Sequence, residues 1–170
     1  MEIRAEKPED IAAIRCVHEQ AFQPRVNEAQ LVELLRQANK LPIALVALQA
    51  ERLVGHVAFS PLTIAIAPAT IRGLGLAPVA VLPELQKKGI GSKLIAQGLE
   101  NCRRGGYDLA VVLGDPNFYA RFGFVRAADY YLENEYNADE AFRVIELQTG
   151  ASSQVKGLVK YRPELQQAGC

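Results

Sequence analysis

Cysteine and histidine are scarce in this sequence of 170 residues. The three cysteines, Cys16, Cys102 and Cys170, lie far apart and form no C-x-x-C pair, which argues against a disulfide framework and against a zinc site. The two histidines, His18 and His56, are too few for a histidine-rich metal site. We therefore expect reduced thiols, no bound metal and a cytoplasmic location.

An excess of charge of one sign and a long apolar run are also missing. Lys plus Arg and Asp plus Glu number 19 each, so there is no global basic field to attract nucleic acid. No apolar run approaches the roughly 20 residues that a membrane span needs. The first ten residues, MEIRAEKPED, lack the apolar core of a signal peptide. Neither nucleic acid nor a membrane is therefore expected as a partner.

The composition that remains is that of an ordinary globular protein. Hydrophobic residues make up 49% of the chain and charged residues 22%. The length suits one domain with a sizeable core, and no linker rich in Pro, Gly or Ser and no internal repeat divides the chain. We expect a single domain over residues 1–170.

The first half of the chain combines helix and strand patterns. Apolar residues at helical spacing predict helices, and runs rich in β-branched and aromatic residues predict strands. A proline inside a strand predicts an edge or a bulge, because it cannot donate a hydrogen bond to its neighbour. The expected strands cover residues 2–6, 42–49, 52–66 and 74–82, the last with Pro78 inside it, and the expected helices cover 11–22 and 27–39.

The pattern changes at Gly89. Apolar residues recur at helical spacing over 90–102, and glycines 105 and 106 end that helix. The continuous apolar run 108–114 is typical of a parallel strand that is covered on both faces. A short helical turn and a strand follow, and then strands within 141–150 and 154–162. The strand, helix and strand around 76–113 form a βαβ unit, which predicts an α/β or mixed α+β fold.

The stretch QKKGIGSK, residues 86–93, lies where this unit passes from strand to helix. It lacks the spacing of a P-loop, and Leu94 stands where a dinucleotide-binding turn needs its third glycine. One interpretation is a turn with solvated lysines. The other is an anion site, because alternating glycines and a helix start present backbone N–H groups and Lys87 and Lys88 add positive charge. Such a site suits a pyrophosphate.

Two motifs carry a family resemblance. VAVLPELQKKGIGSKLI resembles the first signature of the GNAT superfamily of acetyltransferases, and YARFGF, residues 119–124, resembles its second signature, Tyr-x-x-x-Gly-Phe. VGHVAFSP and VVLGDPNFYARFGF resemble a bacterial subgroup of N-acetyltransferases whose acceptors are generally not defined. The resemblance covers nearly the whole chain. It implies a mixed, mostly antiparallel central sheet with a splayed parallel strand pair and flanking helices.

The resemblance also implies where acetyl-CoA, the expected co-substrate, would bind. The strand that carries Pro78 would have a bulge there. Gln86 would shape the turn after the strand. The pantetheine would lie along main-chain atoms of the strand, and the pyrophosphate would be held mainly by N–H groups of the loop. The pantetheine residues would be Val79, Ala80 and Val81, and the pyrophosphate residues would be Lys87, Lys88, Gly89, Ile90, Gly91 and Ser92.

The implied reaction is the transfer of an acetyl group to a primary amine of a small molecule, peptide or protein. The amine would attack the thioester directly in a ternary complex. A main-chain N–H near Val81 would stabilise the oxyanion, and Tyr119 would protonate the CoA thiolate as the general acid. Tyr119 could instead be only a core aromatic residue. The alternative function is a non-catalytic acyl-CoA sensor or partner-binding module.

The general base is left open by the sequence. Glu84, Asp115, Glu28 and a chain of water molecules are alternatives. His56 is a further candidate, although a histidine inside an apolar strand is more often a satisfied core residue. Many members of the resembled family carry an asparagine several residues before the tyrosine, on a longer helix. Asn117 does not match that position, so no cofactor role is assigned to it.

The acceptor side is expected to form from two segments. One is residues 22–28, FQPRVNE, and the other is residues 129–136, DYYLENEY. The acidic and aromatic residues of the second segment suit a cationic amine, and a solvated loop with half-buried tyrosines is the alternative. The acceptor, the acyl group and the oligomeric state are left open, with a homodimer among the possible assemblies.

Overall fold

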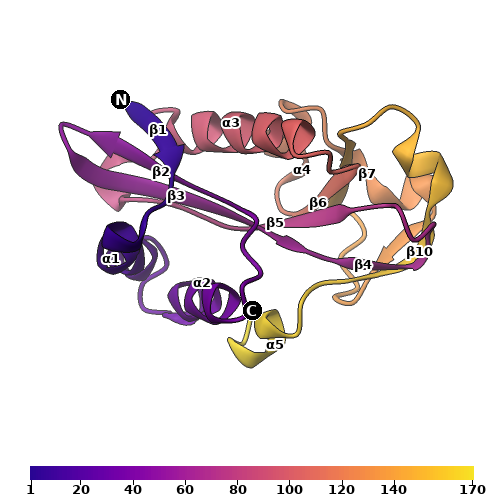
Figure 1. Ribbon diagram of the computed structural model, residues 1–170, viewed down its shortest axis with the longest axis horizontal. Coiled ribbons are helices and arrows are strands. Elements are labelled where there is room, and N and C mark those ends of the chain that lie inside the picture. The colour runs from indigo at the N-terminus through magenta and orange to yellow at the C-terminus, as the bar shows by residue number, and fades with distance from the viewer. The chain divides into compact units, whose positions relative to one another are not determined.

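The computed structural model describes residues 1–170 as a mixed α/β structure (Figure 1). The strands are β1 (Glu2–Ala5), β2 (Ile43–Gln49), β3 (Arg52–Pro61), β4 (Thr63–Ile66), β5 (Gly73–Val81), β6 (Leu109–Leu113), β7 (Val125–Arg126), β8 (Leu132–Asn134), β9 (Phe142–Glu146) and β10 (Lys156–Lys160). The α-helices are α1 (Ile11–Ala21), α2 (Asn27–Gln37), α3 (Ile90–Arg104), α4 (Pro116–Ala120) and α5 (Glu164–Gln167). Short 3₁₀ turns lie at Pro8–Asp10, Pro83–Leu85, Ala127–Tyr130 and Ala151–Gln154.

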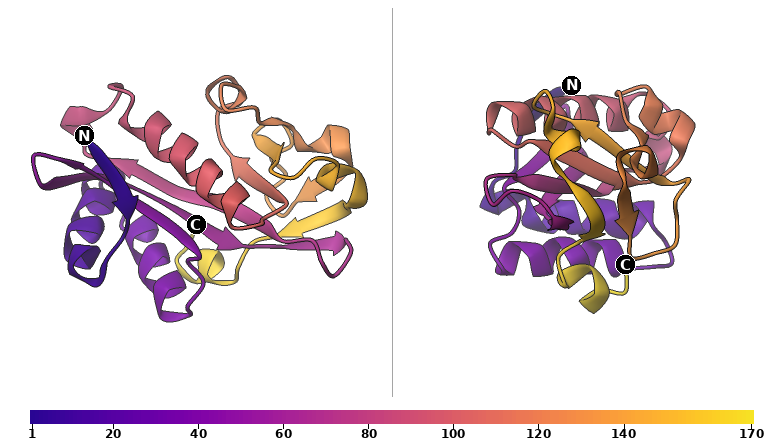
Figure 2. Two further views of the ribbon diagram at one scale, coloured as in Figure 1. Left: turned by 45° about the horizontal axis from the view of Figure 1, so that its top comes forward. Right: turned by 90° about the vertical axis from the view of Figure 1, so that its right-hand side faces the viewer.

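The chain forms two compact units, and the first comprises Met1–Ser60, Ala77–Gly98 and Pro163–Cys170. Its strands follow the order β1-β2-β3-β5, with antiparallel pairing of β1 to β2 and of β2 to β3. Helices α1 and α2 cover one face of these strands and the first part of α3 covers the other (Figure 2). Helix α5 packs against α2.

The core of the first unit depends on a close contact between α3 and β3. Phe59 on β3 is fully buried, and a Cβ atom added to Gly98 would lie 2.5 Å from the Phe59 ring. The backbone of α3 therefore lies directly on that ring. Leu94 and Ile95 on the same face of α3 are also fully buried. This packing fixes the helix whose N-terminus follows the 86–93 stretch.

The second unit comprises Pro61–Leu76 and Leu99–Arg162. Its larger set of strands follows the order β5-β6-β9-β7. Strands β5 and β6 are parallel, and their register pairs Gly73 with Leu109 and Gly75 with Val111. Strand β9 pairs antiparallel with both β6 and β7. A separate sheet has the order β4-β10-β8, with β10 antiparallel to β4 and parallel to β8.

The predicted fold class is confirmed, because the strand pairing is mostly antiparallel, β5 and β6 form a parallel pair, and helices flank the strands. The splay of that pair, the bulge at Pro78 and the single domain over residues 1–170 stay predictions. No helix of the structure combines the length and the apolar character that a membrane span requires.

The prediction of one continuous strand over residues 52–66 is wrong. Strand β3 ends at Pro61, and β4 begins at Thr63 in a different sheet, where it pairs with β10. Pro61 has no N–H to donate, and the N–H of Leu62 donates instead to the carbonyl of Gly73 at 3.2 Å. The change of partner at these two residues separates the strands.

Candidate functional site

The turn before α3 adopts an unusual backbone conformation. Lys87 has a φ of 61° and Gly89 a φ of 83°, both in the left-handed region. A Cβ atom added to Gly89 would meet nothing within 4 Å, so the backbone conformation, and not a lack of space, favours glycine there. Lys87, Lys88 and Gly89 are exposed. The turn therefore presents two cationic side chains and a glycine in the left-handed backbone region immediately before the helix.

The first turn of α3 exposes backbone N–H donors and contains no acidic side chain that could neutralise them. The N–H of Lys93 donates to the carbonyl of Gly89 at 3.1 Å and so begins the helical pattern. The N–H groups of the first turn of any helix point away from the intrahelical carbonyl groups. The first turn contains no acidic residue, so the positive end of the helix dipole is not neutralised from within. This combination suits a phosphate group.

Gln86 ties the loop to the end of β5. Its Nε2 donates a hydrogen bond to the carbonyl oxygen of Val81 at 3.0 Å. Gly91 lies close to the same strand, because a Cβ atom added there would be 3.7 Å from Val81 Cγ2. The structure thus brings the end of β5 and the start of α3 together within the first unit. Every residue expected to bind acetyl-CoA lies in this region, and its role stays a prediction.

Tyr119 lies in the second unit, on the short helix α4. Asp115 caps this helix, since its Oδ1 accepts a hydrogen bond from the N–H of Asn117 at 2.9 Å. The Tyr119 side chain packs edge-on against Phe118 and Phe124, with ring centroids 5.0 Å and 5.6 Å apart. Burial raises the pKa of Tyr119 to about 12, so the phenol keeps its proton at neutral pH. Its position is that of a buried aromatic, and its catalytic role stays a prediction.

The carboxylates proposed as general bases already have partners. Glu84 is exposed and accepts a hydrogen bond from Arg52 at 3.0 Å. Asp115 is the cap of α4. Glu28 accepts one from Arg25 at 2.8 Å through Oε1, while its Oε2 is buried without a hydrogen-bond partner. These contacts do not identify any of the three carboxylates as the general base.

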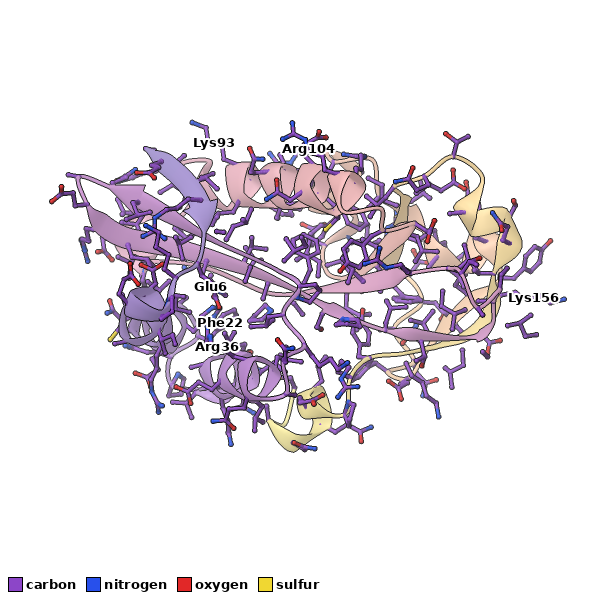
Figure 3. All side chains as sticks on the ribbon, in the orientation of Figure 1. Glu6, Phe22, Arg36, Lys93, Arg104 and Lys156 are labelled. Atoms are coloured by element: carbon purple, nitrogen blue, oxygen red, sulfur yellow. The ribbon has the colours of Figure 1, made fainter.

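His56 is fully buried, as expected for a core histidine, but its partners were not predicted. Its Nδ1 lies 2.9 Å from Nε2 of His18, and its Nε2 lies 2.9 Å from Oε2 of Glu6. Arg36 donates two hydrogen bonds to the Glu6 carboxylate, at 3.0 and 3.1 Å. Figure 3 labels Glu6 and Arg36, which face each other near α1 and α2. The first unit thus contains a hydrogen-bonded chain of two buried imidazoles, a half-buried carboxylate and a half-buried guanidinium.

Burial sets the protonation of this chain. Burial alone would raise the pKa of Glu6, but hydrogen bonds from His56 and Arg36 lower it to about 2. Burial, followed by electrostatic effects of His56 and Arg36, lowers the pKa of His18 to about 3. Burial also lowers the pKa of His56, against the opposing effect of Glu6. At neutral pH the carboxylate is therefore ionised and both imidazoles are neutral.

The two segments expected at the acceptor side lie in different units. Phe22 follows α1, and the exposed residues 23–26 connect it to α2. In the second unit, Tyr131 is 78% exposed, whereas Tyr136 contacts Tyr161 with ring centroids 6.1 Å apart. Glu135 accepts a hydrogen bond from the N–H of Tyr161 at 3.3 Å. This segment is a short 3₁₀ turn and strand β8, and its role in binding an amine stays a prediction.

Comparison with known proteins supplies independent evidence. The family model described as an acetyltransferase (GNAT) domain matches residues 2–127. The uncharacterized N-acetyltransferase YhbS of Escherichia coli K12 is 37% identical over 163 residues, which cover 95% of this chain and 96% of that protein. YjhQ of the same organism, another uncharacterized N-acetyltransferase, is 34% identical over 123 residues, or 68% of this chain and 64% of that protein.

Two solved structures are similar over almost the full length. The crystal structure of YhbS from Escherichia coli in complex with CoA has a TM-score of 0.91 and 35% identity, covering 97% of this chain and 91% of that one. The crystal structure of a GNAT family acetyltransferase from Brucella melitensis in complex with acetyl-CoA has a TM-score of 0.80 and 36% identity, covering 96% of both chains.

Proposed function

Because this chain belongs to the GNAT family of acetyltransferases, we propose that it transfers the acetyl group of acetyl-CoA to a primary amine of a small molecule, peptide or protein. Two similar structures, which hold CoA and acetyl-CoA, support acetyl-CoA as the co-substrate. The amine attacks the thioester directly while both substrates are bound, because holding them together makes the attack effectively intramolecular.

The observation that carries this proposal is the cationic turn at the N-terminus of α3. Lys87 and Lys88 are exposed there, and the first turn of the helix holds no acidic residue. The pyrophosphate of CoA is a dianionic group of the kind that such a helix start binds. Gln86 joins the turn to Val81 on β5, the strand that would hold the pantetheine.

Tyr119 is proposed to assist the leaving thiolate. A phenol whose pKa is about 12 holds its proton at neutral pH. A thiol has an ordinary pKa of about 8.5, so complete proton transfer from this phenol to the CoA thiolate is uphill. Tyr119 would therefore act mainly by donating a hydrogen bond to the developing charge on sulfur, and its contribution to the rate should be modest.

The decisive experiment measures binding and turnover separately. Isothermal titration with CoA should give a dissociation constant in the micromolar range, which corresponds to about −8 kcal/mol. Release of free thiol from acetyl-CoA should then depend on an added primary amine. Binding without amine-dependent release would favour the alternative of a non-catalytic acyl-CoA sensor, and the absence of binding would reject both functions.

Replacing Lys87 and Lys88 together with alanine should weaken CoA binding about tenfold. Two exposed point charges near a phosphate contribute on the order of 1.4 kcal/mol in total. The same calorimetric titration measures the loss, which should shrink as salt is added because screening removes the charge term first. Lys156→Ala is the matched control, since Lys156 is an exposed lysine on β10 of the second unit (Figure 3). Equal affinities for the double variant and wild type would remove these lysines from the site.

Tyr119→Phe should lower kcat about tenfold and leave CoA affinity near wild type, because the ring still fills its place among Phe118 and Phe124. Steady-state kinetics and calorimetry measure the two quantities. Tyr107→Phe, which removes the hydroxyl of a half-buried tyrosine in the same unit, is the control. An unchanged kcat in Tyr119→Phe would limit Tyr119 to packing.

A further inference from the structure

A cavity of about 330 Å³ lies in the second unit, among residues of α3, β7, β9 and the segments around these strands. Its volume is in the range that small-molecule sites occupy. None of the residues expected to bind acetyl-CoA lines it, and neither does Tyr119. The cavity is therefore a second candidate site, separate from the residues of the proposed reaction, and its lining indicates the chemistry of its ligand.

Apolar side chains form one part of the lining, and some of them stand open to solvent. Val144 and Ile145 on β9 are buried, with exposed fractions of 1% and 6%. Val125 on β7 and Tyr130 also line the cavity, yet they are 42% and 38% exposed. Phe122 adds a half-buried ring to the same lining. An apolar group in the cavity would remove this surface from water, and that transfer favours binding.

Arg103, in the last turn of α3, supplies a cation that the protein itself uses little. Its guanidinium makes one ion contact, from Nη1 to Oε2 of Glu100 at 3.9 Å, which is too long for a hydrogen bond. The other oxygen of Glu100 accepts a hydrogen bond from Nε of Arg104 at 3.0 Å. The Arg103 side chain is 39% exposed, so its planar set of N–H donors is open to a ligand in the cavity.

Backbone contacts hold Arg103 beside the apolar part of the lining. Its carbonyl accepts a hydrogen bond from the N–H of Gly106 at 3.0 Å. Nε2 of Gln148 donates to the same carbonyl at 3.3 Å and to the carbonyl of Tyr107 at 3.4 Å. Gln148 follows β9, the strand that carries Val144. The end of α3 and the apolar wall are therefore joined directly, and the cation has a fixed base.

Glu146 is the negative group of the lining, but the turn after β9 already satisfies it. Its Oε1 accepts hydrogen bonds from the hydroxyl of Ser152 and from the Ser152 N–H at 3.0 Å, and its Oε2 accepts one from the N–H of Gly150 at 3.3 Å. The bonds from Ser152 lower the pKa of Glu146, so the carboxylate stays ionised. A permanent negative charge in the lining disfavours a dianion such as a phosphate monoester. Arg103 is left as the charged group that can form new hydrogen bonds.

We propose that this cavity binds a monocarboxylate with an apolar body, of the class of aryl or branched-alkyl acetates. The two carboxylate oxygens pair with the guanidinium of Arg103, whose planar donors match a carboxylate. The apolar body covers Val125, Tyr130 and Val144. This site goes beyond the proposed acetyl transfer, because it shares no residue with the loop and strand that are proposed to hold acetyl-CoA.

Phenylacetate is the first probe, and phenylacetamide, which has nearly the same shape without the charge, is its match. Titration of the wild-type protein is followed by ¹H–¹³C NMR of the methyl groups. Phenylacetate should shift the methyl signals of Val125, Val144 and Ile145 and saturate with a Kd of about 1 mM, a value within reach of so small a ligand. Phenylacetamide should bind about tenfold more weakly, because it lacks the charge-assisted pair with Arg103.

The Arg103→Gln variant tests the cation. It should weaken phenylacetate binding about tenfold and leave phenylacetamide unchanged. Lys93→Gln is the matched control, because Lys93 is an exposed cation earlier on the same helix and does not line the cavity (Figure 3). Its affinity for phenylacetate should equal that of wild type.

The outcomes decide the proposal without any measurement of acetyl transfer. Methyl signals of the cavity that stay unchanged up to about 10 mM phenylacetate overturn it. Equal affinities for the acid and the amide, or equal losses in Arg103→Gln and Lys93→Gln, overturn it too, since the carboxylate is then not read by Arg103. Shifts confined to residues 86–93 that vanish when CoA is added also overturn it, because the probe then occupies the loop proposed for the cofactor.

Discussion

Replacing Phe59 with alanine is expected to lower the free energy of unfolding by about 3–5 kcal/mol, the range for deleting a buried aromatic ring. Phe59 is 0% exposed, and its ring lies directly beneath the backbone of α3 at Gly98. The helix cannot collapse freely into the space left by the ring, because Leu94 and Ile95 are already packed on the same face. The variant therefore loses both the transfer energy of the ring and the contacts around the cavity.

Urea unfolding measures this loss as a lower midpoint at an unchanged slope. Phe59→Leu should cost much less, since leucine fills most of the space. Gly98→Ala provides a coupled test, because the added methyl group would meet Cε2 of Phe59 at 2.5 Å and Cζ at 2.9 Å. Leucine lacks both atoms. Gly98→Ala should therefore destabilise the wild-type protein more than it destabilises the Phe59→Leu variant. Equal losses in these two backgrounds would contradict a close contact between Gly98 and the Phe59 ring.

Acidification from pH 7 to pH 4.5 is expected to lower the free energy of unfolding by about 3 kcal/mol through His18 alone. In the unfolded chain a histidine binds a proton below a pKa of about 6.5, whereas the folded protein keeps His18 neutral until about pH 3. Stability is therefore lost as the pH falls through this interval, at about 1.4 kcal/mol per pH unit. His56 acts in the same direction, because burial also lowers its pKa.

Urea unfolding at the two pH values measures this dependence. The difference between wild type and His18→Gln gives the contribution of His18 together with any change in its partner His56, since the ionisable groups far from the pair cancel. Arg15→Gln is the control, because Arg15 is exposed and pairs with Glu19 and Glu33 on the surface of α1 and α2. Identical pH dependence in wild type and His18→Gln would show that His18 has an ordinary pKa. Below about pH 4.5 Glu6 adds a further loss, since its folded pKa is about 2.

The parts of the structure that could be predicted from the sequence are those with local signals. The helix from Ile90 to Arg104 follows from the spacing of its apolar residues, and the turn before it follows from Gly89 and Gly91. The loop proposed to bind the cofactor is continuous in sequence, so a motif was enough to propose it. The separation of β4 from β3 depends on pairing with β10, which lies about 90 residues later, and no local pattern encodes that partner.

The chain from Glu6 to His18 shows the limit of motif reasoning more sharply. Its members come from the residue that follows β1, from α1 and from β3, so no short motif contains them. A signal was present, however. His18 and His56 both stand at positions of apolar faces, and a buried polar side chain needs a partner. That need links the two buried histidines to each other, but nothing in the sequence identifies Glu6 as the further partner of His56.

The hydrogen bond from Gln86 to Val81 has a consequence for the proposed binding of the cofactor at this loop. A loop that becomes ordered only when its ligand binds loses conformational entropy at that moment, and the loss weakens binding. Here the left-handed residues Lys87 and Gly89 and the amide of Gln86 already hold the turn in one arrangement. Ordering occurs during folding instead of during association. The loop should accordingly bind its anion as a preorganised receptor, with little change in shape between the free and the bound protein.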